Sequence, residues 1–216
     1  MFKYILFDLD GTLTDSAPGI INSVKYALSK FGMHETDDNK LRKFLGPPLI
    51  LSFAELYGFS KEKSQKAVEY YREYFVPNGM FENKIYSGIP ELLQKLKADG
   101  KALIVATSKP EPFAEQIVRR FGLYDYFDMV AGSNTDNTRC KKAQVIEYAL
   151  KTLGINNREH AVMIGDREHD IIGAKETGLK SIGVLYGYSA PGELETAGAD
   201  FTAGTPREIL DIINSN

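Results

Sequence analysis

Four short groups of polar residues in this sequence have the types and spacing to carry chemistry. The first is Asp8-Leu9-Asp10-Gly11-Thr12, in which two carboxylates stand two residues apart after an apolar run. Residues two apart in an extended chain share a face, so Asp8 and Asp10 are expected to converge, and Gly11 lets the backbone turn sharply near a ligand. The same short pattern by itself also fits a surface turn with two solvated acids.

The second group is Thr107-Ser108-Lys109, directly after the apolar run 102–106. A hydroxyl and turn amides at that point suit an anionic oxygen, although Ser and Thr in this position also cap helices. Because this run ends in polar residues as the first one does, we expect Thr107 and Ser108 to lie at the same edge of a sheet as Asp8.

A lysine at the start of a predicted helix forms the third group. Lys142 falls near the centre of the apolar face of that helix, whereas its neighbour Lys141 lies well away from it. That face consists of Val145, Ile146, Ala149, Leu150 and Leu153. A buried ammonium group needs an anionic partner, since leaving it unpaired is costly. The alternative is that Lys142 reaches past the edge of the core to water.

The fourth group, 165–170, reads Gly-Asp-Arg-Glu-His-Asp and follows the apolar run 161–164. Carboxylates gathered in one place repel one another unless a cation neutralises them, and oxygen ligands favour Mg²⁺ over Zn²⁺. Asp166 and Asp170 are therefore candidate metal ligands. The alternative is an acidic turn that caps the next helix.

Short apolar runs separated by helical patterns must position these groups. Runs typical of buried parallel strands cover 4–9, 102–107, 129–131, 161–165 and 181–185, with amphipathic helical patterns between them. We therefore expect an α/β fold with a Rossmann-like parallel sheet.

One stretch, 16–83, breaks this alternation because it shows helical stripes and no convincing strand. We expect an all-helical insert there, with 1–15 and 84–216 forming the α/β core. Within the insert, Gly46-Pro47-Pro48 must be a loop, since two prolines cannot continue a helix.

Composition excludes several classes of function. The 216 residues fit one to two domains. A net charge of −3, from 26 Lys and Arg against 29 Asp and Glu, provides no basic field for a nucleic-acid backbone. The single Cys140 cannot form an internal disulfide, no apolar run is long enough to span a bilayer, and no secretory signal pattern is present. We expect a cytoplasmic protein without nucleic acid or membrane as partner.

Taken together, the four groups resemble the ordered motifs of the haloacid dehalogenase superfamily. The resemblance covers essentially the whole chain, because the helical insert stands where that superfamily carries its C1 cap. The chain looks most like the phosphoglycolate phosphatase-like group. The residues that carry this resemblance are Phe7-Asp8-Leu9-Asp10-Gly11-Thr12-Leu13, Gly46-Pro47-Pro48-Leu49, Thr107-Ser108, Lys142 and Gly165-Asp166 through Asp170.

The resemblance implies a phosphatase that acts on a small phosphomonoester, such as phosphoglycolate or a 5′-nucleotide. Asp8 would attack phosphorus and form an aspartyl-phosphate, while Asp10 would protonate the leaving oxygen and then deprotonate the attacking water. Thr107, the Ser108 amide and Lys142 would bind the phosphoryl oxygens.

The resemblance also implies a Mg²⁺ cofactor. A carboxylate oxygen of Asp8, the backbone carbonyl of Asp10 and Asp166 would hold it, with Asp170 acting through water or by orienting its neighbours. A carboxylate nucleophile beside an anionic phosphate needs such a cation to offset repulsion.

Cap residues near the site are less specific. The loop 46–49 is expected to enter the site, although a plain turn between helices fits the same residues. Lys109, Arg139, Arg167 and His169 lie near the motifs, and the sequence favours solvated or structural roles for them over contact with substrate.

Other activities share parts of this pattern. A phosphomutase of the β-phosphoglucomutase type uses the same nucleophile. Its fourth motif reads Glu-Asp-Ser, where this chain has Gly165-Asp166-Arg167. A pyrophosphatase on the same fold stays an alternative, whereas dehalogenases lack the acid at Asp10. A receiver-type signalling domain and a catalytically idle binding protein are the alternatives outside enzymes.

Overall fold

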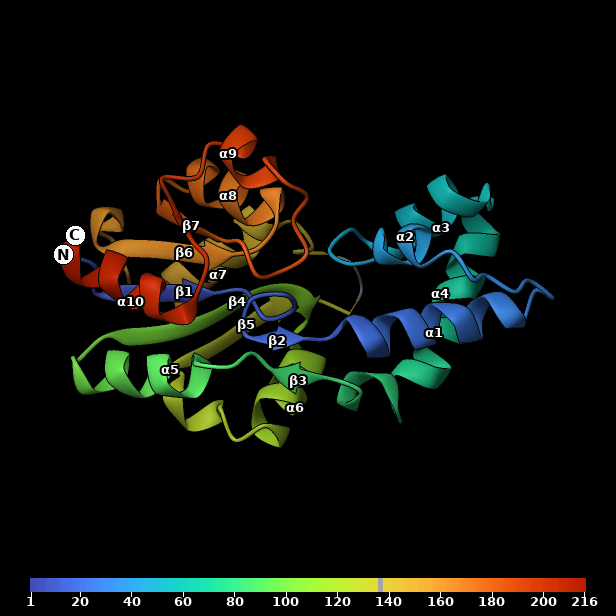
Figure 1. The fold of residues 1–216 in the computed structure, drawn as a ribbon, viewed down its shortest axis with the longest axis horizontal. Coiled ribbons are helices and arrows are strands. Elements are labelled where there is room, and N and C mark those ends of the chain that lie inside the picture. The colour runs from blue at the N-terminus through green and yellow to red at the C-terminus, as the bar shows by residue number, and fades with distance from the viewer. Residues whose placement is uncertain (136–137) are drawn as a thin grey trace. The chain divides into compact units, whose positions relative to one another are not determined.

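The computed structural model describes residues 1–135 and 138–216, which form two compact units (Figure 1). One unit contains Met1–Thr14 and Ile85–Asn216, and the other contains Asp15–Lys84. The range expected for the helical insert, 16–83, lies inside the second unit. That this unit serves as a cap stays a prediction.

The first unit is built on a six-stranded sheet whose neighbouring strands all run parallel, as the α/β fold class requires. Its strand order is β5-β4-β1-β6-β7-β8. The strands are β1 Tyr4–Phe7, β4 Ala102–Pro110, β5 Met129–Ser133, β6 Ala161–Gly165, β7 Lys180–Val184 and β8 Phe201–Ala203. The five predicted strands are present, but β8 was missed because its three residues include a single buried side chain, Ala203.

Helices cover both faces of this sheet, with α8 and α9 on one side and α5 and α6 on the other in Figure 1. They are α5 Ile89–Ala98, α6 Glu111–Arg120, α7 Lys142–Thr152, α8 Glu168–Glu176, α9 Glu193–Ala197 and α10 Pro206–Ser215, with short 3₁₀ turns at Tyr124–Tyr126 and Arg158–His160. The central strand β1 is fully buried at Ile5, Leu6 and Phe7. Its continuous apolar run reflects the helices packed on both sides.

The second unit is helical. It contains α1 Ala17–Ser29, α2 Asp38–Arg42, α3 Leu49–Tyr57, α4 Lys61–Phe75 and a 3₁₀ turn at Gly79–Phe81. The chain passes between the units through two short paired strands, β2 Thr14–Asp15 and β3 Lys84–Ile85. Gly46, Pro47 and Pro48 form the predicted loop before α3. In the part of the chain that the structure describes, every helix is too short or too polar to cross a membrane.

A network around Glu35 provides a pH-dependent test of the helical unit. Glu35 accepts hydrogen bonds from the Asp37 amide at 3.0 Å and the Tyr57 hydroxyl at 3.1 Å, and pairs with Lys40 at 3.2 Å. The Asp37 amide and Lys40 lower the pKa of Glu35 to about 2 from 4.5. This contribution to stability is therefore complete above pH 4.5 and is lost as the pH falls through about 2.

We expect the Glu35 carboxyl to titrate near pH 2 in a carbon-detected NMR titration of the folded protein. In the Glu35→Gln variant the melting temperature should depend less on pH between about 4.5 and 2, since the variant lacks the group whose charge the network stabilises. An ordinary midpoint near 4.5 would contradict the network.

Candidate active site

The predicted site residues come together at the carboxyl edge of three neighbouring strands. Asp8 follows β1, Thr107 lies in β4 and Asp166 follows β6, and β1 stands between the other two strands. The register pairs Phe7 with Val105 on one side and with Ile164 on the other, so Asp8, Thr107 and Asp166 follow these paired positions by one or two residues each. Ligands of open α/β sheets bind at this edge.

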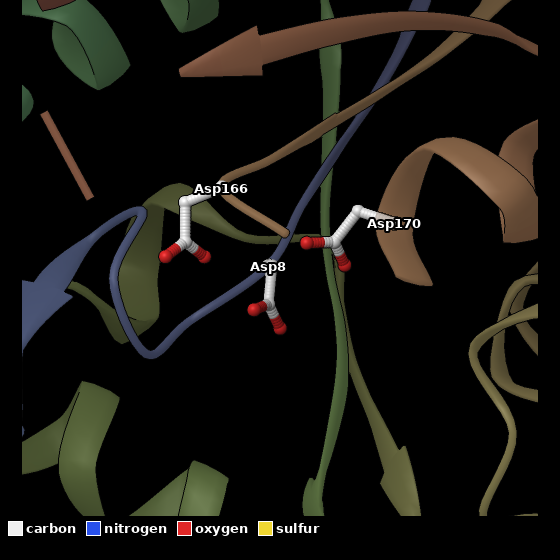
Figure 2. A group of neighbouring side chains, drawn as sticks. All are labelled: Asp8, Asp166 and Asp170. Carbon is white, nitrogen blue, oxygen red and sulfur yellow. The ribbon is translucent and has the colours of Figure 1, made fainter. Parts of the chain in front are cut away.

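Three carboxylates form the centre of the site (Figure 2). Asp8, Asp166 and Asp170 each offer a carboxylate oxygen within 4.8 Å of those of the others. Burial raises the pKa of Asp8 to about 6, against the opposing effect of Lys142. Burial, with Asp170 and Asp8 nearby, raises the pKa of Asp166 well above its usual range. This concentration of buried negative charge favours a bound cation.

Lys142 offsets part of this charge. Its ammonium lies 2.7 Å from an Asp8 oxygen and 2.8 Å from an Asp170 oxygen, and donates to the carbonyl of Ala106 at 2.9 Å. Burial alone lowers the pKa of Lys142, but the two carboxylates outweigh it and raise the pKa. The predicted inward orientation is confirmed, since Lys142 is buried whereas Lys141 is exposed.

Asp170, in the first turn of α8, links the Lys142 ammonium to the start of that helix. One oxygen pairs with Lys142, and the other accepts the backbone amide of Arg167 at 3.0 Å at the start of α8. A Cβ at Gly165 would lie 2.2 Å from the Asp170 Cγ, so only glycine fits there. The alternative of an acidic helix cap is thus also realised, because this carboxylate caps α8 and orients the lysine.

Asp166 is held by a segment that the sequence analysis did not single out. The amide of Tyr188 donates to Asp166 at 2.7 Å, and Thr12 donates to its other oxygen at 3.4 Å. A Cβ at Gly187 would lie 2.3 Å from the Cβ of Asp166 and 2.5 Å from the carbonyl oxygen of Gly11. The Tyr-Gly-Tyr sequence at 186–188, which begins two residues after the last residue of β7, was the available signal.

Replacing a glycine can cost stability through an unfavourable φ or through a collision of the added Cβ, and Gly11 and Gly100 allow the two costs to be compared. Both have positive φ, 84° and 71°, but a Cβ at Gly11 would lie 2.1 Å from an Asp166 oxygen, whereas one at Gly100 meets nothing within 4 Å. We expect Gly100→Ala to lower the free energy of unfolding by about 1–2 kcal/mol. Gly11→Ala should lower it by more, because the added Cβ also collides with the Asp166 carboxylate. Urea unfolding measures both costs, and equal costs would contradict the collision.

The strand β1 ends at Phe7, so a loop and not strand alternation places Asp10. Hydrogen bonds from the Gly11 amide to the Thr14 carbonyl at 2.7 Å and from the Thr14 amide to the Leu9 carbonyl at 3.0 Å close this loop. Asp8 and Asp10 have different lysine partners: Lys142 pairs with Asp8, and Lys109 pairs with Asp10.

Lys109 lies in an ion pair that the sequence analysis did not predict. Its ammonium contacts both oxygens of Asp10, at 2.9 and 2.6 Å, and its side chain is only 7% exposed. Of the two roles expected for it, solvated or structural, the structure favours the structural one, and its partner Asp10 could not be predicted. Arg139 pairs with Glu111, Arg167 pairs with Glu193, and His169 is exposed, so these three match the structural or solvated roles expected of them.

Thr107 and Ser108 complete the edge. Thr107 is buried, and its hydroxyl accepts the amide of Lys109 at 3.2 Å. A hydroxyl that accepts in this way keeps its single hydrogen for donation. Ser108 is half-buried beside it.

Comparison with known proteins agrees with this geometry. The family described as haloacid dehalogenase-like hydrolase matches residues 5–184. This range includes Asp8, Lys142, Asp166 and Asp170, and it ends before Gly187 and Tyr188. The chain belongs to this family. A 5′-nucleotidase from Pseudomonas aeruginosa is 46% identical to this haloacid dehalogenase-like hydrolase over 193 residues, which are 89% of this chain and 87% of that protein.

Two further relatives of this hydrolase are also phosphatases by name. A phosphoglycolate phosphatase from Aquifex aeolicus is 30% identical over 215 residues, covering 99% of this chain and 98% of its own. The crystal structure of a predicted phosphatase from Clostridium acetobutylicum superposes with a TM-score of 0.95 at 49% identity and covers 100% of both chains. The chain is an enzyme of this hydrolase family, of the phosphatase type.

Proposed function

We propose that the chain is a Mg²⁺-dependent phosphatase that hydrolyses a small phosphomonoester through an aspartyl-phosphate on Asp8. The observation that carries the proposal is the position of Asp8, a buried carboxylate 2.7 Å from Lys142 and grouped with Asp166 and Asp170. A nucleophile needs positioning and charge neutralisation for phosphoryl transfer, and this arrangement offers both.

In the first step, an Asp8 oxygen forms a bond to phosphorus while the bond to the leaving oxygen breaks. Asp10 donates a proton to that leaving oxygen, so that an alcohol departs. Lys142, the Thr107 hydroxyl and the Ser108 amide bind the oxygens of the transferring group. In the second step, water forms a bond to phosphorus, Asp10 accepts its proton, and the bond to Asp8 breaks to release phosphate.

The donor set suits Mg²⁺, since every candidate ligand is an oxygen and two of the three buried carboxylates, Asp8 and Asp170, share the single ammonium of Lys142. We propose that Asp8, the carbonyl of Asp10 and Asp166 hold the ion, with Asp170 orienting Lys142. When bound, Mg²⁺ would neutralise the charge of the phosphoryl group.

Nucleoside 5′-monophosphates and phosphoglycolate are the proposed substrates, in line with the names of the two relatives. The helical unit Asp15–Lys84 is the proposed cap that selects the leaving group. The entry of the loop 46–49 into the site stays a prediction.

The test is phosphate release from these compounds with Mg²⁺ and with a chelator. We expect turnover to vanish with the chelator and return with added Mg²⁺. Asp166→Asn should raise the Mg²⁺ concentration for half-maximal rate by about 100-fold, because it removes a charged ligand. The exposed Asp125 offers a matched control in Asp125→Asn, which should behave as the native chain. Turnover that persists in the chelator would contradict the proposal.

A further inference from the structure

The pair between Lys109 and Asp10 is more enclosed than a surface ion pair. The side chains are 7% and 20% exposed, and the ammonium reaches both carboxylate oxygens, at 2.9 and 2.6 Å. Exposed pairs contribute little to stability, and removing a lysine from water is costly. The proposed mechanism gives Lys109 no role, so its burial against Asp10 needs a reason.

The backbone of β4 brings Lys109 to this position. The pairing of β4 with β5 shifts register between Ala106 and Pro110, where four steps on β4 match two on β5. Such irregularities redirect side chains at the end of a strand. Within the irregular segment the Lys109 amide donates to the Thr107 hydroxyl at 3.2 Å. One segment therefore ties the proposed phosphate-binding hydroxyl to the ammonium that holds Asp10.

Asp10 itself sits on a loop that cannot hold its side chain by strand packing. Gly11, with φ of 84°, follows directly, and the carboxylate is partly exposed. A contact with both oxygens restrains the direction in which the carboxylate points, which a contact with one oxygen does not. Proton transfer to a leaving oxygen requires such orientation.

We infer that Lys109 is a positioning residue, which orients the Asp10 carboxylate for proton transfer to the leaving oxygen. The inference rests on the proposed function, in which Asp10 is the acid. It gives the two lysines of the site different roles, since Lys142 acts on the nucleophile and Lys109 acts on the acid.

The leaving group provides the decisive measurement. An alkoxide, as in a nucleoside 5′-monophosphate, needs a proton to depart, whereas p-nitrophenolate departs without one. General acid catalysis contributes about 10²–10⁴-fold where it is needed. We compare kcat/KM for both compounds, because this constant includes only steps up to departure of the leaving group and excludes the later attack of water.

Lys109→Met is expected to lower kcat/KM for the nucleotide by about 30-fold and for p-nitrophenyl phosphate by less than about 3-fold. The loss with the nucleotide is smaller than the full contribution of general acid catalysis because Asp10 itself is still present. Asp10→Ala should show the same selectivity with a larger loss. Because both changes act on one proton transfer, the double variant should be no worse than Asp10→Ala alone. Lys109→Arg should recover part of the loss.

The exposed Lys151 supplies the control, since Lys151→Met makes the same chemical change without a predicted effect. Thermal unfolding shows whether each variant folds, and Lys109→Gln, which keeps a neutral donor, replaces Lys109→Met if that variant does not. Equal losses with both substrates, no loss, or additive losses in the double variant would overturn the inference. If the native chain hydrolyses phosphoglycolate and not the nucleotide, phosphoglycolate replaces the nucleotide in this comparison, because its leaving alkoxide also needs a proton. A native chain that hydrolyses none of these three compounds would instead refute the proposed function and, with it, this role.

Discussion

Replacing Asp8 with asparagine is expected to lower phosphate release by about four orders of magnitude or more. An amide cannot form the acyl-phosphate of the proposed two-step route, and removing a nucleophile typically has effects of this size. The fold should survive, because the asparagine side chain is close in size to the native carboxylate and Lys142 keeps its pair with Asp170 at 2.8 Å. The loss should therefore appear in turnover and not in the melting temperature.

Acid quenching during turnover should trap the proposed aspartyl-phosphate in the native chain. A peptide that contains Asp8 should carry phosphate that hydroxylamine removes, and the peptide from Asp8→Asn should carry none. Asp125→Asn is the matched control, since it exchanges an exposed carboxylate for an amide away from the site. If Asp8→Asn retained native turnover, the covalent route would be wrong.

Replacing Lys142 with alanine has the second large expected effect, on stability as well as on turnover. The ammonium lies between Asp8 and Asp170, at 2.7 and 2.8 Å, and is buried. Removing one partner of a buried ion pair leaves uncompensated charge and typically costs about 3–5 kcal/mol. Turnover should fall by at least about 100-fold, because the proposed mechanism loses one of its donors to the transferring phosphoryl group.

Urea unfolding at neutral pH measures this cost, and added Mg²⁺ should restore part of the stability by neutralising the same carboxylates. Lys141→Ala is the control, because it removes the neighbouring but exposed ammonium from the start of the same helix. Equal unfolding free energies for the two variants would show that the buried pairs contribute nothing.

Much of the site could be predicted from single segments. Asp8, Thr107 and Asp166 each follow or end an apolar run that reads as a buried strand, and parallel strands deliver their carboxyl ends to one edge. Lys142 could be placed because helical periodicity puts it on the apolar face. These inferences need only local pattern, and the structure groups Asp8, Asp166 and Asp170 as expected.

Contacts between distant segments were beyond this reasoning. The strand β8 was missed because three residues with one buried side chain leave no periodicity to detect. Gly187 and Tyr188 were missed because they matter through their contact with Asp166, and the sequence around 187 contains no pattern that predicts this contact.

The sequence by itself determined the class of chemistry, because its four ordered polar groups resemble those of the haloacid dehalogenase superfamily and because carboxylates in these positions suit a hard cation. Tertiary structure alone decided how those groups are paired. Lys109 and Asp10 are 99 positions apart, and whether a lysine meets a carboxylate or water depends on a register shift in β4 and on burial. An ion pair depends on distance and solvent exposure in three dimensions, and neither is a property of one segment.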